Sequence, residues 1–106
     1  MAIWKIENGL DLLITALCLD YKRRKIAIES GVLSKRTDTE FRYYNFKMFD
    51  ATAEIVGERF AEIYIEEIGK RIGFAKSNID CVSEITYKNY KKMIKDNIAK
   101  KLHLCD

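Results

Sequence analysis

A segment near the C-terminus carries the side chains of this chain that are best suited to chemistry with nucleic acid. Isoleucine, lysine and asparagine recur there at intervals of three and four residues, which places them on one face of an α-helix. Asparagine can pair bidentately with adenine, lysine can reach guanine or a phosphate, and isoleucine can contact a thymine methyl group. The pattern therefore predicts a helix that enters the major groove of DNA. The residues predicted to contact DNA are Ile85, Lys88, Asn89, Lys92 and Lys95.

The same lysines have a second interpretation, which the sequence leaves open. Lysine is the usual solubilising residue on the outer face of a surface helix. On that view the lysine face is only solvated, and the protein is a helical interaction or assembly protein with no role at DNA.

The element that positions these side chains is well marked in the sequence. Ser83 supplies a side-chain oxygen at the N-cap, and Glu84 places a negative charge at the positive end of the helix dipole. Apolar residues recur on the opposite side at intervals of three and four and predict a buried stripe. The members of this stripe are Tyr87, Tyr90, Ile94, Ile98 and Leu102.

No set of residues in the chain predicts catalysis, a metal site or a cofactor. His103 stands alone, without an oriented acidic partner for acid–base work. Cys18, Cys81 and Cys105 are far apart and lack C-x-x-C spacing. We therefore expect no enzymatic activity, no catalytic residue and no small-molecule substrate.

The length and composition are those of one globular domain. The chain of 106 residues predicts a single helical domain, 1–106. The longest apolar run, Leu12 to Leu19, is far shorter than the roughly 20 residues that span a bilayer. Glu7 and Asp11 stand where the apolar part of a secretory signal would begin. We expect a cytoplasmic protein that does not bind membranes.

Three further helices precede the C-terminal one in this prediction, which makes the fold all-α with four helices. The first helix is expected from Glu7 or Asn8 to Glu29, ending before Ser30 and Gly31. The second starts at about Thr37, where Thr37 and Glu40 match a capping box. The third runs from about 58 to 72, and a connection over 73–82 leads to the last helix. The last two helices then form a helix-turn-helix-like pair with an unusually long turn.

Two features of these helices predict contacts beyond the core. The first half of the first helix is apolar almost all round, which predicts a homodimer. Its second half contains four consecutive basic residues, 22–25, and we expect Arg23 and Arg24, together with Lys76, to touch DNA phosphates. Phe46, Phe49, Ala53, Val56, Phe60 and Ile63 step by three and four and predict a further core stripe.

An acidic series occupies the middle of the chain. Its members, Asp50, Glu54, Glu58, Glu62 and Glu66, recur at intervals of four. Like charges at this spacing cost about 0.2–0.5 kcal/mol per pair in an isolated helix, so we expect compensation. Either Gly57 divides the series, or basic residues from 22–25, the last helix or a second subunit face it. A carboxylate metal site is disfavoured because no Glu-x-x-His pair is present.

The chain also resembles a known family. The segments that carry the resemblance are similar to small prophage-encoded transcriptional regulators of the ArpU and RinA type. They are Ile68-Gly69, Ile72-Gly73, Ser83-Glu84-Ile85-Thr86-Tyr87-Lys88, Lys91-Lys92 and Ile98-Ala99-Lys100-Lys101-Leu102, together with Tyr21-Lys22-Arg23-Arg24. The resemblance covers roughly the last forty residues and implies a helical protein with a DNA-binding C-terminal part. It places Ile85, Thr86, Lys88, Asn89 and Lys92 toward DNA.

Together these observations predict a transcriptional regulator of phage or prophage origin that binds double-stranded DNA as a homodimer. Dimerisation would set the spacing of its half-sites.

Overall fold

The computed structural model describes the backbone of residues 2–104 and the side chains of residues 9–104. Its four α-helices are α1 (Ala2–Ser30), α2 (Lys35–Val56), α3 (Glu58–Gly69) and α4 (Glu84–Lys101), with a 3₁₀ turn, η1 (Phe74–Lys76), between the last two. No strand occurs within the described range. The prediction of an all-α domain with four helices is confirmed.

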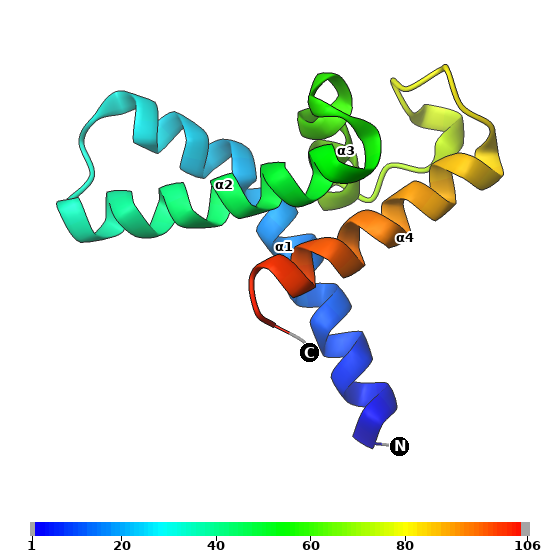
Figure 1. Ribbon diagram of the computed structural model, residues 1–106, viewed down its shortest axis with the longest axis horizontal. Helices are drawn as coiled ribbons and strands as arrows, with labels where there is room; N and C mark the ends of the chain where they lie inside the picture. The colour runs from blue at the N-terminus through cyan, green and yellow to red at the C-terminus, as the bar shows by residue number, and fades with distance from the viewer. Residues whose placement is uncertain (1, 105–106) are drawn as a thin grey trace.

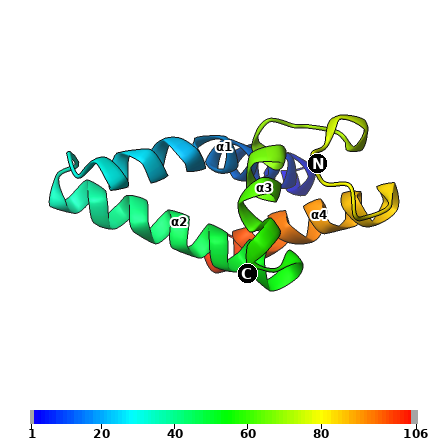
Figure 2. The same cartoon turned by 90° about the horizontal axis from the view of Figure 1, so that it is seen from above.

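The helices pack around one another rather than in a single layer. α1 and α2 run antiparallel and are joined by a tight turn at one end of the molecule (Figures 1 and 2). Away from that turn, α3 packs against both of them, and α4 lies mainly against α2 and α1. Within residues 2–104, no helix combines the length and the apolar character that crossing a membrane requires.

The ends of α1 and α2 differ from the prediction in two ways. α1 begins at Ala2, before the expected start at Glu7 or Asn8, because no helix breaker occurs in this stretch. α2 begins at Lys35, and its N-cap is Ser34, whose Oγ accepts a hydrogen bond of 3.3 Å from the Thr37 backbone N–H. The predicted start at a Thr37–Glu40 capping box is therefore wrong, since Ser34 already satisfies that donor.

Gly57 breaks the helical run between α2 and α3. Its φ is +86°, a conformation that residues with a Cβ rarely adopt, and its N–H donates to the Ala53 carbonyl at 2.8 Å. The break also resets the helical phase. The predicted core stripe is also wrong at its first member, because Phe46 is exposed and α2 packs through Asn45, Met48 and Thr52 instead.

The hydrophobic core draws on all four helices. Its central members are Ile14, Cys18, Met48, Tyr64, Ile65, Ile68, Tyr87, Ile94 and Ile98. The predicted stripe of α4 is confirmed, with Tyr87, Ile94, Ile98 and Leu102 buried and Tyr90 partly buried. This side of α4 is therefore packed against the core, and this packing determines which residues of α4 face outward.

The closest backbone approach joins α1 to α3. A Cβ built on Gly69 would lie 2.6 Å from the Leu19 Cα and 2.7 Å from the Cys18 carbonyl carbon. Real Cβ atoms do not occur at such distances. Glycine at position 69 therefore allows the two helices to touch.

Candidate nucleic-acid interface

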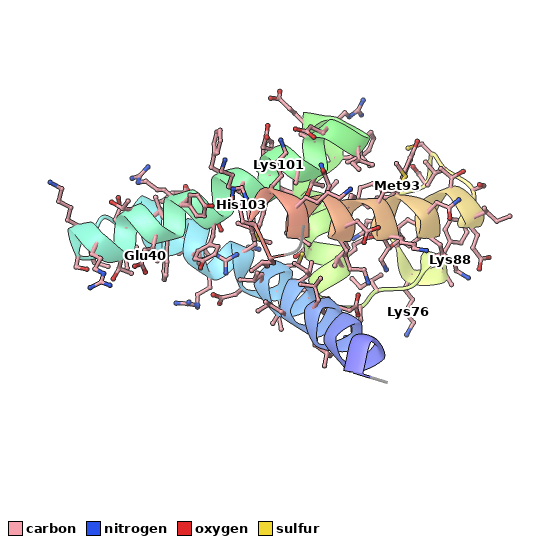
Figure 3. All side chains as sticks on the ribbon, turned by 60° about the horizontal axis from the view of Figure 1, so that its bottom comes forward. Glu40, Lys76, Lys88, Met93, Lys101 and His103 are labelled. Carbon is pink, nitrogen blue, oxygen red and sulfur yellow. The ribbon has the colours of Figure 1, made fainter. Side chains whose placement is uncertain are left out.

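The side of α4 opposite the core is open to solvent. The N-cap is Ser83, as predicted, and its Oγ accepts from the Thr86 N–H at 3.2 Å. Ile85 is 74 % exposed, and Lys88, Asn89 and Lys92 are exposed with it. Figure 3 shows α4 lying across the front of the molecule with Lys88 and Met93 on it. This face of α4 therefore presents isoleucine, lysine and asparagine side chains together to solvent.

Thr86 has a different role from the other residues predicted to face DNA. Its hydroxyl accepts a hydrogen bond of 2.9 Å from the Ser83 Oγ, and its backbone N–H is the donor to the same cap. Thr86 is half-buried. It therefore helps to fix the start of α4 and lies at the edge of the exposed face.

A buried carboxylate, which sequence reasoning missed, holds α4 and the preceding segment 70–83 against α3. Glu67 is 1 % exposed and accepts hydrogen bonds from Ser77 Oγ at 2.6 Å, Asn78 N–H at 2.8 Å and Tyr87 O–H at 2.7 Å. The available signal was its position three residues after Tyr64, on the apolar side of α3.

The segment between α3 and α4 is long for a helix-turn-helix turn, which has three or four residues. It covers 70–83 and contains η1. The two helices still meet through their aromatic rings, because the Tyr64 ring lies 5.8 Å from that of Tyr87 and 6.2 Å from that of Tyr90. The helix-turn-helix-like relation of this pair stays a prediction.

Lysines on α4 line a groove of about 750 Å³ between α4 and the first half of α1. Leu10 and Ile14 of α1 and Ala99 of α4 contribute its apolar part. Two acids, Asp11 and Asp96, also border it. The lysines that line it are Lys88, Lys91, Lys92, Lys95 and Lys100. Cations therefore outnumber acids in this groove, and an anionic ligand is favoured there.

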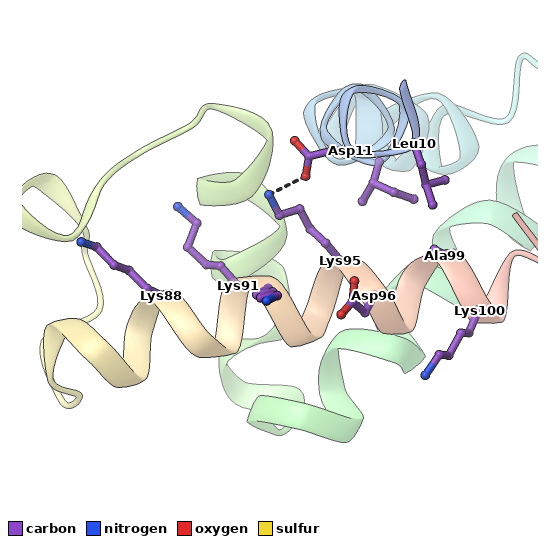
Figure 4. Close-up of a pocket in the computed structure, with 10 residues that line it drawn as sticks. Leu10, Asp11, Lys88, Lys91, Lys95, Asp96, Ala99 and Lys100 are labelled. Carbon is purple, nitrogen blue, oxygen red and sulfur yellow. Dashed lines mark hydrogen bonds and ion pairs between the residues drawn. The ribbon is translucent and has the colours of Figure 1, made fainter. Parts of the chain in front are cut away.

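The lysines of the groove differ in how they are held (Figure 4). Lys95 Nζ donates to Asp11 Oδ1 at 2.8 Å, across the groove. Lys88 pairs with Glu84 at 2.8 Å along α4. Lys91 Nζ donates to the Ile72 carbonyl at 2.7 Å, and burial lowers the pKa of this lysine. Lys92 has no ion pair with any residue whose side chain is described.

The other predicted phosphate contacts are placed unequally. Lys76 is exposed on η1, which touches α4 (Figure 3). Arg23 is exposed on α1, where it pairs with Asp20 and lies over the Phe41 ring, away from the groove lining.

Arg24 is a correction to the prediction. It is 3 % exposed and donates to Asn45 Oδ1 at 2.7 Å, Asp20 Oδ2 at 3.1 Å and the Leu17 carbonyl at 2.8 Å. The Arg24 guanidinium makes these hydrogen bonds inside the fold and is not exposed to a ligand, so the predicted contact of Arg24 with a DNA phosphate is wrong. Four consecutive basics wrap around a helix, and one of them must then face inward.

Comparison of the chain with protein-family models, with curated proteins and with solved structures finds no match.

Both sequence alternatives for the acidic series are confirmed: Gly57 divides it between α2 and α3, and lysines of α1 and α4 face part of it. Lys101 of α4 pairs with Asp50 at 3.1 Å and also with Glu54, and Lys25 of α1 pairs with Glu62 at 2.7 Å. These lysines hold the carboxyl pKa values of Glu54 and Glu62 below their usual range. Asp50, Glu54 and Glu62 therefore link neighbouring helices, and Lys25 and Lys101 are not free cations.

Among the side chains that the structure describes, no three His, Cys, Asp or Glu residues gather to hold a metal ion. Cys18 is a buried free thiol whose pKa burial raises to about 12, and Cys81 is an exposed free thiol. His103 is exposed after the end of α4. Cys105 lies outside the described residues.

Proposed function

We propose that this protein binds double-stranded DNA through the exposed side of α4 and acts as a transcriptional regulator. One observation carries the proposal: Ile85, Asn89 and Lys92 share the outward side of a helix whose opposite side is locked into the core. A helix that recognises bases needs one side held rigidly by the protein and, on the opposite side, side chains of different chemistry.

The dimensions of α4 suit a major groove. An α-helix with its side chains is about 10–12 Å wide, and the major groove of B-DNA is about 12 Å wide. The outward residues occupy the first half of α4, which is the part that contacts base edges in reading helices. Asn89 would pair with adenine, Lys92 with guanine or phosphate, and Ile85 with a thymine methyl group. Lys76 and Lys88 supply phosphate contacts next to them.

The resemblance to prophage regulators of the ArpU and RinA type supports the regulatory part of the proposal. The strings that carry it include the N-cap and the first turn of α4. A prophage origin and the control of phage genes are proposed on the same ground.

Binding to duplex DNA at several salt concentrations tests the proposal. Fluorescence anisotropy with a labelled mixed-sequence duplex should give an affinity that falls steeply between 50 and 200 mM salt, because each neutralised phosphate contributes a slope of about −0.9 on a log–log plot. Lys92→Ala should lower the affinity and reduce the magnitude of that slope by about one. Asn89→Ala should weaken binding to preferred sequences by about 1–3 kcal/mol.

Lys35→Ala is the matched control, because Lys35 is an exposed lysine at the start of α2, at the end of the molecule away from α4 (Figure 1). It removes the same charge but should leave the slope unchanged. Absence of any salt-dependent binding at 50 mM salt would sink the proposal. So would equal effects of Lys92→Ala and Lys35→Ala.

A second candidate function, self-assembly, is favoured by an apolar stripe on the outer side of α1. Leu12, Leu19 and Ile26 are spaced by seven residues, and each is more than half exposed. They lie opposite the inward residues Ile14 and Tyr21. Exposed leucines repeating on one side of a long helix suit a helix of another subunit. We propose that this stripe joins two copies, either as the dimer of a DNA-binding protein or as the main activity of an assembly protein.

A further inference from the structure

We propose that the groove between α1 and α4 binds the phosphate backbone of one DNA strand. When DNA is absent, the Asp11 carboxylate occupies this binding site as an internal competitor. This inference rests on the DNA binding proposed above and adds to it a second contact surface and a built-in restraint on affinity.

The first support is the direction of the lysines. At 100° per residue, Lys88, Lys91 and Lys95 lie roughly 60–120° around α4 from Ile85, on the side of α1. Figure 4 shows their side chains extending to the same side of the helix, whereas Lys100 extends to the other. When a helix enters a major groove, residues on its flanks face the groove walls, which are lined by phosphates. The groove is therefore placed beside the base-reading residues, where a strand would pass.

The second support is the electrostatics of the groove. Five lysines and two acids border it. Lys91 is half-buried, and both burial and the nearby charge of Lys95 lower its pKa. Neighbouring ammonium groups of this kind repel each other, and an anion between them removes that repulsion. A phosphate is a strong acceptor for several lysines at once.

Asp11 already supplies one such anionic oxygen. Its carboxylate accepts from Lys95 Nζ at 2.8 Å and reaches it from α1, 84 residues away in the chain. A carboxylate and a phosphate offer lysine the same kind of charged acceptor. The Asp11 side chain is 52 % exposed and that of Lys95 is 29 % exposed, so water reaches the pair from the Asp11 side and weakens it, and a DNA strand can displace it. Asp11 would then lower the affinity for DNA without preventing binding.

Four variants test this role against general charge effects. Asp11→Asn frees Lys95, and we expect it to tighten binding to the labelled duplex by about two- to fivefold at 50 mM salt. Asp96→Asn is the matched control: it removes the same charge from the same groove, but Asp96 has no ion pair with a residue whose side chain is described. Its effect should be clearly smaller.

Lys95→Gln should weaken binding and reduce the magnitude of the salt slope by about 0.9. In the double variant Asp11→Asn/Lys95→Gln, the gain from Asp11→Asn should shrink to that of Asp96→Asn, because the competitor then has no partner. All variants should keep the thermal midpoint of the wild type within about 3 °C, since an ion pair that is partly open to water contributes little to stability.

The possible failures are distinguishable. If the wild type binds with a steep salt slope but Asp11→Asn and Asp96→Asn behave alike, the groove inference is wrong and the α4 proposal stands. The same holds if Lys95→Gln leaves the slope unchanged. If neither the wild type nor Asp11→Asn binds duplex DNA at 50 mM salt, both proposals are wrong.

Discussion

Replacing Gly69 by alanine should destabilise this protein far more than a single methyl group ordinarily would. Gly69 ends α3 where that helix touches the backbone of α1 at Cys18 and Leu19. The atoms that a new Cβ would meet at 2.6–2.7 Å are backbone atoms inside a long helix. They cannot rotate aside as a flexible side chain could, so α1 and α3 must separate.

The expected loss can be worked out from two opposing effects. Overpacking in a core costs about 1–3 kcal/mol, and a clash between two backbones belongs at the upper end of that range. Alanine in a helix recovers up to about 1 kcal/mol over glycine, which leaves a net loss of roughly 2 kcal/mol. For a domain of this size, this is a fall in thermal midpoint of about 10 °C.

Gly9→Ala is the control, because it makes the same chemical change inside α1. Among the atoms that the structure describes, a Cβ at Gly9 meets none within 4 Å, so only the gain in helix propensity remains. The expected result is a stabilisation of about 0.5–1 kcal/mol, opposite in sign to that of Gly69→Ala.

Thermal and urea unfolding followed by circular dichroism at the helix band would measure both variants. Equal m values would show that the folded and unfolded states expose similar areas in each protein. The close approach of α1 and α3 would be refuted if Gly69→Ala melted at or above the wild-type midpoint.

Two further predictions concern pH and self-association. Ion pairs hold the carboxyl pKa values of Asp20, Glu54 and Glu62 below their ordinary range, so the folded state binds protons less readily than the unfolded one. The stability that these ion pairs contribute is present above about pH 4.5 and is lost as the pH falls through the lower pKa values of the folded state. The urea midpoint should therefore drop between pH 5 and 3, and it should drop less in Glu62→Gln. A midpoint that stayed constant would contradict these pairs. In analytical ultracentrifugation, the wild type should form dimers at micromolar concentration, and Leu19→Glu should abolish them. Val32→Glu, at an exposed turn residue outside the stripe, should leave the dimers intact. A monomeric wild type would exclude the α1 interface.

The sequence by itself determined the features that depend on neighbouring residues. Ser83 caps α4 because its hydroxyl reaches a backbone N–H only three residues on, and Gly31 ends α1 with a positive φ. The buried stripe of α4 follows from helical periodicity in the same way. These features made the four helices and the outward placement of Ile85, Asn89 and Lys92 predictable.

Only the tertiary structure decided which of several similar side chains is covered. Arg23 and Arg24 are adjacent and alike, but Arg24 faces Asn45 of α2 and is buried, while Arg23 stays exposed. Glu67 is enclosed by groups that lie up to 20 residues later in the chain. The Lys95–Asp11 pair depends on where α4 crosses α1. Helical periodicity determines the direction in which each side chain leaves its helix. Long-range packing determines which residue lies in that direction, and the burial, the pairing and the shape of a groove all depend on that neighbouring residue.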